Sequence, residues 1–124
     1  MRFISIYRPD KKHLTTPPNA QQMEEMGKFI NEAFAAGVLL VTEGLAPSQP
    51  ADLKIRLSQG TYSTTDGPFT EAKEVIGGFA IMQVKSRDEV IEWTRRFLAI
   101  AGDGEAEVRQ LFEISPIDQI KQRR

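Results

Sequence analysis

The chain of 124 residues has no cysteine and only one histidine, and these two scarcities remove several classes of chemistry. Without cysteine there is no disulfide, no thiolate nucleophile and no zinc–thiolate site. The single histidine, His13, cannot supply the three protein ligands that a catalytic zinc site takes, so we expect no metal. The sequence also lacks Walker and EF-hand motifs, and Gly77-Gly78 lacks the further glycine of a dinucleotide site. We therefore expect no cofactor.

An excess of charge of either sign is also lacking. Sixteen basic residues against seventeen acidic ones leave a net charge of -1, so no broad cationic face for nucleic acid is predicted. No run approaches the roughly 18 apolar residues that span a bilayer, and the N-terminal residues do not resemble a secretion signal. We expect a cytoplasmic protein that binds neither nucleic acid nor membranes.

What the chain does have is the composition of one globular domain. It is 40% hydrophobic and 27% charged, and at this length a chain buries roughly two-thirds of its unfolded surface. We expect a single domain over residues 1–116 and a tail over 117–124. His13 lies in a lysine-flanked loop, where a histidine is usually solvated.

Hydrophobic periodicity and turn residues predict two helices and six strands. Asn19 and Gln22, like Ser86 and Glu89, have the spacing of capping boxes that open a helix. The first helix should end at Gly37 and the second at residues 102–104. The expected strands cover residues 3–8, 38–42, 53–57, 61–64, 79–85 and 108–114.

The apolar positions within these elements predict which side of each is buried. In the first helix, helical spacing indicates a buried face. In the strand over 53–57, apolar residues alternate with Lys54 and Arg56, which is typical of a half-buried strand. The expected buried residues are Met23, Met26, Ile30 and Phe34 in the helix, and Leu53, Ile55 and Leu57 in the strand.

This order of elements indicates an α+β protein of the ferredoxin-like type, β-α-β-β-α-β, with an antiparallel sheet and an added hairpin. Two amphipathic helices can cover only one face of a four-stranded sheet. The other face still carries apolar side chains and needs a cover. We therefore expect a homodimer that forms through the open face of the sheet.

The most informative segment runs from Asp66-Gly67-Pro68-Phe69 to Gly77-Gly78. It combines a strong turn dipeptide, a rigid proline and an aromatic residue with a cluster of charges. As pure structure, this segment clamps the hairpin to the next strand while Phe69 packs into the core. As a functional element, it places Asp66 at a pocket, where the carboxylate accepts a ligand proton or orients a base.

Other residues are candidates for the same pocket. Glu43 follows an apolar strand and precedes a glycine, and Arg56 can pair with Glu43 or Glu71 or hold an anionic ligand. We predict Asp66, Glu43 and Arg56 as catalytic residues, although each is also compatible with a solvated position. The predicted ligand-binding residues are Tyr7, Arg8, Phe69, Glu71 and Lys73.

The chain resembles the YCII-related family, and within it the group with the Asp-Gly-Pro-Phe motif. The resemblance rests on residues 3–7, on 36–47 with Glu43-Gly44-Leu45-Ala46-Pro47, on 53–57, on 65–74 and on 77–93. It implies a dimeric α+β barrel with a pocket beside each sheet, in a superfamily that includes small-molecule isomerases and monooxygenases. Classical members carry a histidine on the first helix. This helix has none, so their proposed His–Asp chemistry does not carry over.

Three functions remain open from the sequence. The first is a homodimer that binds a small molecule, including the case of a cofactor-independent enzyme that uses carboxylates for acid–base steps. The second is a regulatory or interaction module associated with transcription, because some members of the family lie beside alternative sigma factors. The third is a structural dimer in which the motif loop serves only the fold.

Overall fold

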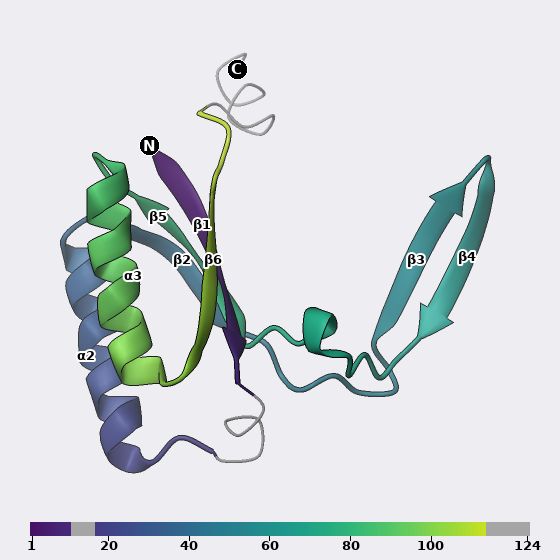
Figure 1. Ribbon diagram of the computed structural model, residues 1–124, viewed down its shortest axis with the longest axis horizontal. Coiled ribbons are helices and arrows are strands. Elements are labelled where there is room, and N and C mark those ends of the chain that lie inside the picture. Colours follow the sequence, from purple (N-terminus) through teal and green to yellow (C-terminus); the bar gives the residue numbers. More distant parts are fainter. Residues whose placement is uncertain (11–16, 114–124) are drawn as a thin grey trace.

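The computed structural model describes residues 1–10 and 17–113. His13 and the tail predicted over 117–124 lie outside these residues. Within them, four strands form one sheet and two form a separate hairpin (Figure 1). The elements are β1 (Arg2–Pro9), α2 (Ala20–Ala35), β2 (Leu39–Gly44), β3 (Leu53–Ser58), β4 (Thr61–Asp66), the 3-10 turn η1 (Ala72–Glu74), β5 (Gly78–Gln83), α3 (Arg87–Ala101) and β6 (Gly104–Gln110).

The main sheet has the strand order β2-β5-β1-β6, and every neighbouring pair is antiparallel. This is the strand order of a ferredoxin-like fold, and β3 and β4 form the added hairpin between its two halves. Both helices cover the same face of the sheet (Figure 1). The predicted α+β ferredoxin-like class with an antiparallel sheet is confirmed.

Side-chain caps begin both helices at the predicted residues. The Asn19 side chain accepts a hydrogen bond from Gln22 N at 2.7 Å, and Ser86 Oγ accepts one from Glu89 N at 3.1 Å. The Gln22 side chain does not return to its own cap, because it donates to the carbonyls of Ile100 and Ala101 at 2.9 and 3.2 Å. This contact ties the start of α2 to the end of α3 and satisfies carbonyls that the helix leaves open.

The core lies between the helices and the sheet. It is built from Phe3 on β1, Ala33 on α2, Met82 on β5 and Val90 on α3, together with Val38, Leu39 and Val84. Two residues of the predicted apolar face of α2 do not belong to the core, because the side chains of Met23 and Phe34 are 63% and 46% exposed. The helix turns its smaller Ala33 to the sheet instead.

The last strand begins earlier than the sequence pattern predicts. The predicted range is 108–114, whereas β6 runs from Gly104 to Gln110. Gly104 pairs with Pro9, and a Cβ atom there would lie 2.6 Å from the Arg8 carbonyl oxygen. Gly104 therefore serves close strand pairing, while Gly102, with a φ of 100°, ends α3. The turn between α3 and β6 therefore consists of Gly102 and Asp103, and Gly104 already belongs to the strand.

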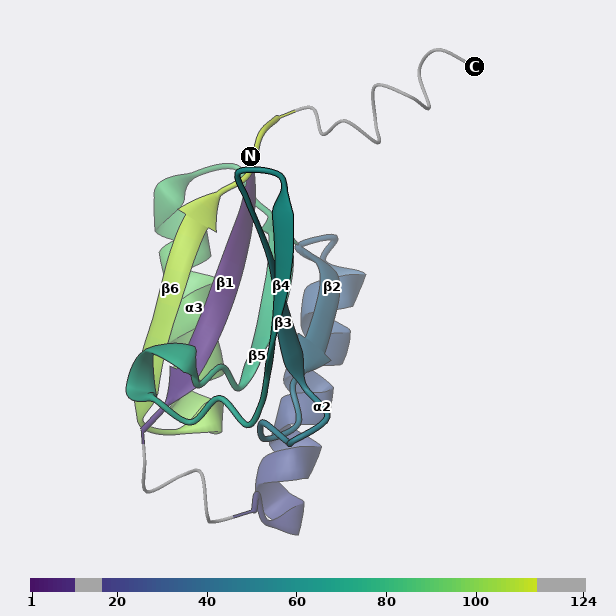
Figure 2. The ribbon, with the colours of Figure 1, turned by 90° about the vertical axis from the view of Figure 1, so that its right-hand side faces the viewer.

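The hairpin stands apart from the core. All residues of β3 and β4 are exposed, so the predicted half-buried strand over 53–57 is wrong for the single chain. Figure 1 shows the sheet nearly on edge, with the helices on one side and the hairpin on the other. In Figure 2 the hairpin passes in front of the uncovered face of the sheet.

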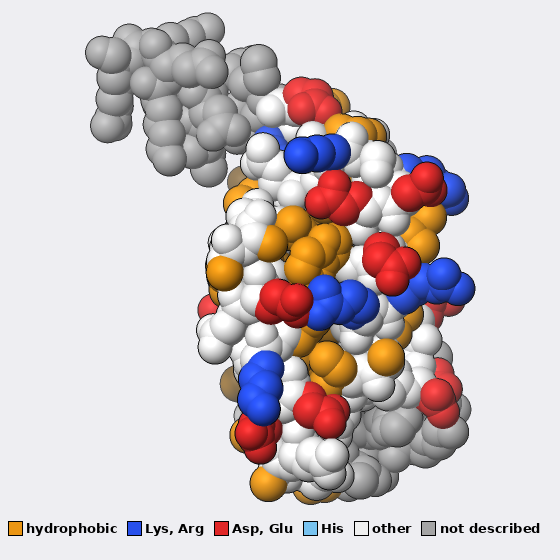
Figure 3. All heavy atoms as spheres, turned by 90° about the vertical axis from the view of Figure 1, so that its left-hand side faces the viewer, with side chains coloured by type: hydrophobic (Ala, Val, Ile, Leu, Met, Phe, Trp, Pro, Cys, Tyr) orange, Lys and Arg blue, Asp and Glu red, His pale blue; other side chains and the backbone are white. Residues whose placement is uncertain are grey.

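The two outer layers of the molecule differ in character. On the helix side, charges of both signs are spread over the surface (Figure 3). On the opposite side, the strand alternation that buries Phe3 and Ser5 turns Ile4 and Ile6 outward, where they pair with Ile81 and Phe79. The open face of the sheet therefore has an apolar centre.

Two glycines provide a matched test of this packing. At Gly78 a Cβ atom would lie 2.6 Å from the Glu43 carbonyl oxygen, so Gly78→Ala must push β2 and β5 apart. Gly27 in α2 has no atom within 4 Å of such a position. We expect Gly78→Ala to lower the free energy of unfolding by about 1–3 kcal/mol.

The control, Gly27→Ala, should raise the free energy of unfolding by about 0.5–1 kcal/mol, because glycine is a poor residue for a helix interior. Urea denaturation of both variants measures the two effects. Equal stability of the two variants would contradict the close approach of the strands at Gly78.

Candidate functional site

A cavity of about 230 Å³ lies between the helix layer and the sheet. Its walls are mostly apolar and rich in aromatic rings. Exposed residues at the end of β2, Glu43 and Gly44, also line it, so the cavity reaches the surface there. The helices contribute Met26, Phe29, Ile30 and Ala33 from α2 and Trp93, Thr94 and Phe97 from α3, while β1, β2 and β5 supply the floor.

Two small hydroxyl residues are buried in the wall of this cavity. Thr94 is 8% exposed, and its Oγ1 is a buried oxygen for which the described residues offer no hydrogen-bond partner. Ser5 on β1 is 7% exposed and also lines the cavity. Burial of a hydroxyl without a partner costs roughly 1–3 kcal/mol. The Thr94 hydroxyl is therefore a polar group in the cavity wall that the described residues leave unsatisfied.

Two further hydroxyls in the wall are already engaged. Thr42 Oγ1 donates to the Phe79 carbonyl at 3.0 Å, which links β2 to β5. The Tyr7 hydroxyl donates to the carbonyls of Gly102 and Asp103 at 3.1 and 3.3 Å, and its ring meets Phe97 edge-to-face at 5.2 Å. These two residues therefore shape the cavity.

The pKa of Tyr7 is raised above its ordinary value of 10.0. Burial of the hydroxyl is the largest cause, and the negative charges of Asp10 and Asp103 add to it. All three effects disfavour the phenolate. Tyr7 is therefore a neutral hydrogen-bond donor at physiological pH.

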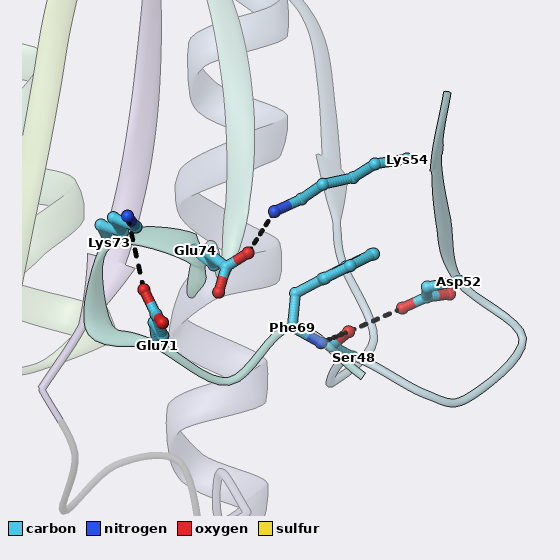
Figure 4. Close-up of polar contacts among 7 residues, drawn as sticks. All are labelled: Ser48, Asp52, Lys54, Phe69, Glu71, Lys73 and Glu74. Carbon is cyan, nitrogen blue, oxygen red and sulfur yellow. Dashed lines mark hydrogen bonds and ion pairs between the residues drawn. The ribbon is translucent and has the colours of Figure 1, made fainter. Parts of the chain in front are cut away.

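The motif loop lies at the base of the hairpin and has a structural role. Gly67 N donates to the Asp52 carbonyl at 2.6 Å, and a Cβ atom at Gly67 would lie 2.5 Å from the Gln49 carbonyl oxygen. Phe69 N donates to Ser48 Oγ at 2.7 Å, and Ser48 Oγ donates in turn to Asp52 at 3.0 Å (Figure 4). These contacts fix both ends of the hairpin to each other.

The charges of this loop form local pairs. Lys54 of β3 reaches back to Glu74 of η1 and lies over the Phe69 ring at 4.3 Å, and Lys73 pairs with Glu71 at 3.4 Å (Figure 4). The hydrogen bond from Lys54 is the largest cause that lowers the pKa of Glu74. Phe69 is only partly buried beneath Lys54 and is not a core residue, so the predicted packing of its ring into the core is wrong.

The structure separates the residues that we predicted as one site. Tyr7 lines the cavity, and Glu43 borders it at the end of β2, although its pairing with Phe79 turns the Glu43 side chain to the open face of the sheet. Asp66 and Arg56 are exposed on the hairpin, and among the described residues Arg56 pairs with neither Glu43 nor Glu71. Arg8 pairs with Glu107 on the open side of the sheet at 2.9 Å. Phe69, Glu71 and Lys73 belong to the loop at the hairpin base.

Sequence reasoning missed the two hydroxyl residues that distinguish the cavity. A signal was present, because Ser5 alternates with Phe3 and Tyr7 on the buried face of a strand. Thr94 likewise follows Val90 by four residues on the buried face of a helix. A polar residue at a position where the pattern predicts core needs a partner, and this requirement singles out both residues from the pattern alone.

Two classes of site receive no support from the described part of the chain. Over residues 1–10 and 17–113, no group of three or more His, Cys, Asp or Glu side chains converges to hold a metal ion. Neither α2 nor α3, the described α-helices, is long and apolar enough to cross a membrane.

Comparison with known proteins places the chain in a family. The model of the YCII-related domain matches residues 1–115. One solved structure with a similar fold is the 5-chloro-2-hydroxyhydroquinone dehydrochlorinase from Burkholderia phenoliruptrix in complex with 2,5-dihydroxybenzoquinone. It is 17% identical, the alignment covers 90% of this chain and 93% of that one, and the TM-score is 0.49. No functionally curated protein matches the chain.

The raised pKa of Tyr7 predicts how stability depends on alkaline pH. Below pH 10 the hydroxyl is protonated in both the folded and the unfolded chain, so its contribution is fully present. As the pH rises above 10, the unfolded chain loses this proton first, and the free energy of unfolding falls. Tyr7→Phe should remove this alkaline decline and, at pH 7, cost about 1 kcal/mol for the lost hydrogen bonds.

Urea denaturation between pH 8 and 11.5 measures the effect. The matched change Tyr62→Phe, at a side chain that is 73% exposed, should leave the alkaline decline in place. An unchanged alkaline slope in Tyr7→Phe would refute the assignment.

Proposed function

Because this chain belongs to the YCII-related family, whose model spans the sheet and both helices, we propose that its activity resides in the cavity that these elements enclose. The protein binds a small, uncharged ring compound there, with one polar atom directed to the unpartnered hydroxyl of Thr94. That buried hydroxyl is the observation that carries the proposal.

The size and lining of the cavity support this class of ligand. An apolar cavity of about 150 Å³ already admits benzene, so about 230 Å³ is sufficient for one ring with substituents. Phe29, Trp93 and Phe97 present aromatic surfaces, which favour edge-to-face or offset contacts with another ring. No lysine or arginine is among the described residues that line the cavity, so an anionic ligand would be buried without a counter-ion.

Acid–base catalysis in the cavity requires a side chain that points into it. Of Asp66, Glu43 and Arg56, all three of which the structure describes, only Glu43 lines the cavity. Glu43, however, pairs with Phe79, so its carboxylate lies on the open face of the sheet and not on the face that the helices cover. We therefore propose binding, without an acid–base step by these three residues, as the activity of the cavity. Asp66 and Arg56 are then residues of the hairpin.

The binding proposal makes a specific prediction about Thr94→Val. This change keeps the shape of the side chain and removes the unpartnered hydroxyl, so the ligand-free protein should become more stable by about 1 kcal/mol. Binding of p-cresol should weaken by about threefold to tenfold, since one hydrogen bond is lost. Binding of p-xylene, which has the same shape without the hydroxyl, should not change.

Trp93 is the only tryptophan and lines the cavity, so its fluorescence reports binding of both compounds. Thr42→Val is the matched control for stability. The Thr42 hydroxyl donates to the Phe79 carbonyl, so its removal should lower the free energy of unfolding, whereas Thr94→Val should raise it. If both compounds lose affinity equally in Thr94→Val, or neither binds the wild type, the proposed ligand class is wrong.

We also propose that the protein is a homodimer through the open face of the sheet. Ile4, Ile6, Phe79 and Ile81 form its apolar centre, and the helices leave this face uncovered. A second copy provides a cover of the same shape and apolar character, and two sheets pack face to face at about 10 Å. Symmetric pairing of one patch with itself is the commonest form of oligomer.

Light scattering at micromolar concentration tests the homodimer. We expect a mass of about twice 13.9 kDa. The charge-introducing variant Ile4→Lys should shift the population to the single chain, while Lys28→Glu on the helix side should not. A wild-type mass of 13.9 kDa would exclude the homodimer and leave the ligand proposal untouched.

A further inference from the structure

The hairpin β3–β4 forms an arm with one apolar face. The register pairs Leu57 with Tyr62 and Ile55 with Thr64, so the side chains of these residues and of Leu53 lie on the same face. Lys54 points back to Glu74 at the base of the arm (Figure 4), which places the apolar residues on the face opposite Lys54. Leu53, Ile55, Leu57 and Tyr62 are 52%, 66%, 58% and 73% exposed.

An arm of this kind is not stable by itself. A single two-stranded hairpin is marginal in water, and exposed apolar strands invite aggregation. The chain nevertheless secures the base of the arm with the hydrogen bonds of Gly67 and Phe69 and with the Lys54–Glu74 pair. These contacts hold the two ends of the arm together while its apolar face stays exposed, so we infer that the cover comes from another molecule.

The position of the arm indicates which molecule that is. It stands on the uncovered side of the sheet, away from the helices (Figures 1 and 2). Any molecule that covers the apolar centre of the sheet must therefore lie next to the arm. In a two-fold dimer each copy supplies one sheet and one arm, so a single closed assembly covers all of these apolar surfaces.

The area of the sheet supports the same conclusion. Four strands about 4.8 Å apart, with about six residues at about 3.3 Å each, cover about 400 Å² in projection. Each partner of a standard stable interface contributes about 800 Å². The arm is the neighbouring apolar surface that would enlarge an interface formed by the sheet.

We propose that the apolar face of the β3–β4 hairpin packs on the second copy of this chain, so that each subunit holds its partner with an arm. The inference rests on the homodimer proposed above. It assigns to residues 53–66 a role in association, which accounts for an alternating strand pattern that the single chain does not bury.

The absence of cysteine provides a direct test. A single cysteine introduced by Ile55→Cys carries a benzophenone photocrosslinker, and the labelled protein is irradiated at a concentration where the wild type is a dimer. We expect a covalent product of about twice 13.9 kDa. Glu24→Cys on α2, where the side chain is 68% exposed, is the matched control and should give no such product.

A second variant measures the energetic role. Ile55→Lys combined with Leu57→Lys should raise the dimer dissociation constant at least tenfold without loss of fold, because both side chains are exposed in the single chain. Ser63→Lys with Thr65→Lys adds the same charge to the opposite face of the arm and should change the dissociation constant less. Sedimentation and circular dichroism follow association and folding.

The outcomes separate this proposal from the sheet-face homodimer. A wild-type dimer that gives no crosslink from residue 55, and that tolerates both lysines at 55 and 57, overturns the arm and leaves the homodimer standing. A wild-type monomer overturns both.

Discussion

The structure depends on one constraint: two helices can cover only one face of a four-stranded sheet. The same face that the helices cover contains the core, and it also contains the cavity, which opens towards the end of β2. The other face leaves Ile4, Ile6, Phe79 and Ile81 partly exposed in the single chain. The cavity and the apolar centre of the open face thus lie on opposite faces of the same strands.

The helix–sheet interface contains two buried polar side chains. Thr94 and Ser5 occupy positions where apolar side chains would pack without penalty, and the Thr94 hydroxyl has no partner among the described residues. An ordered water or a ligand can satisfy a buried polar group of this kind. The nearby hydroxyls of Thr42 and Tyr7 are bonded to carbonyls, which shows that the fold can satisfy a hydroxyl in this region.

The motif loop illustrates how a distinctive sequence can serve geometry. Gly67 is required because the backbone of residues 49–52 approaches it too closely for a side chain. Glu71, Lys73 and Glu74 form pairs within the loop and with β3, at the surface, where such pairs contribute little to stability. The loop therefore holds the two ends of the hairpin together, and its residues Asp66, Phe69, Glu71 and Lys73 do not line the cavity.

Much of the fold followed from local rules. The caps at Asn19 and Ser86, the helix-ending glycines and the alternation in β1 depend on neighbours along the chain, so the elements and their order could be predicted. The start of β6 could not, because Gly104 is needed for its approach to Arg8, a residue near the other end of the chain. The exposure of Leu53, Ile55 and Leu57 was missed for a similar reason, since alternation marks an apolar face without saying which molecule covers it.

The sequence by itself determined the ferredoxin-like order of elements, the absence of cysteine chemistry and the membership in a family. Only the tertiary structure decided which residues meet in the cavity, because Ser5, Glu43 and Thr94 come from three separate elements. It also decided that Arg56 and Asp66 stand on the hairpin while Glu43 borders the cavity. Periodicity along the chain predicts the face of its own helix or strand on which a side chain lies. Which side chains of different elements come close together is decided by how those elements pack.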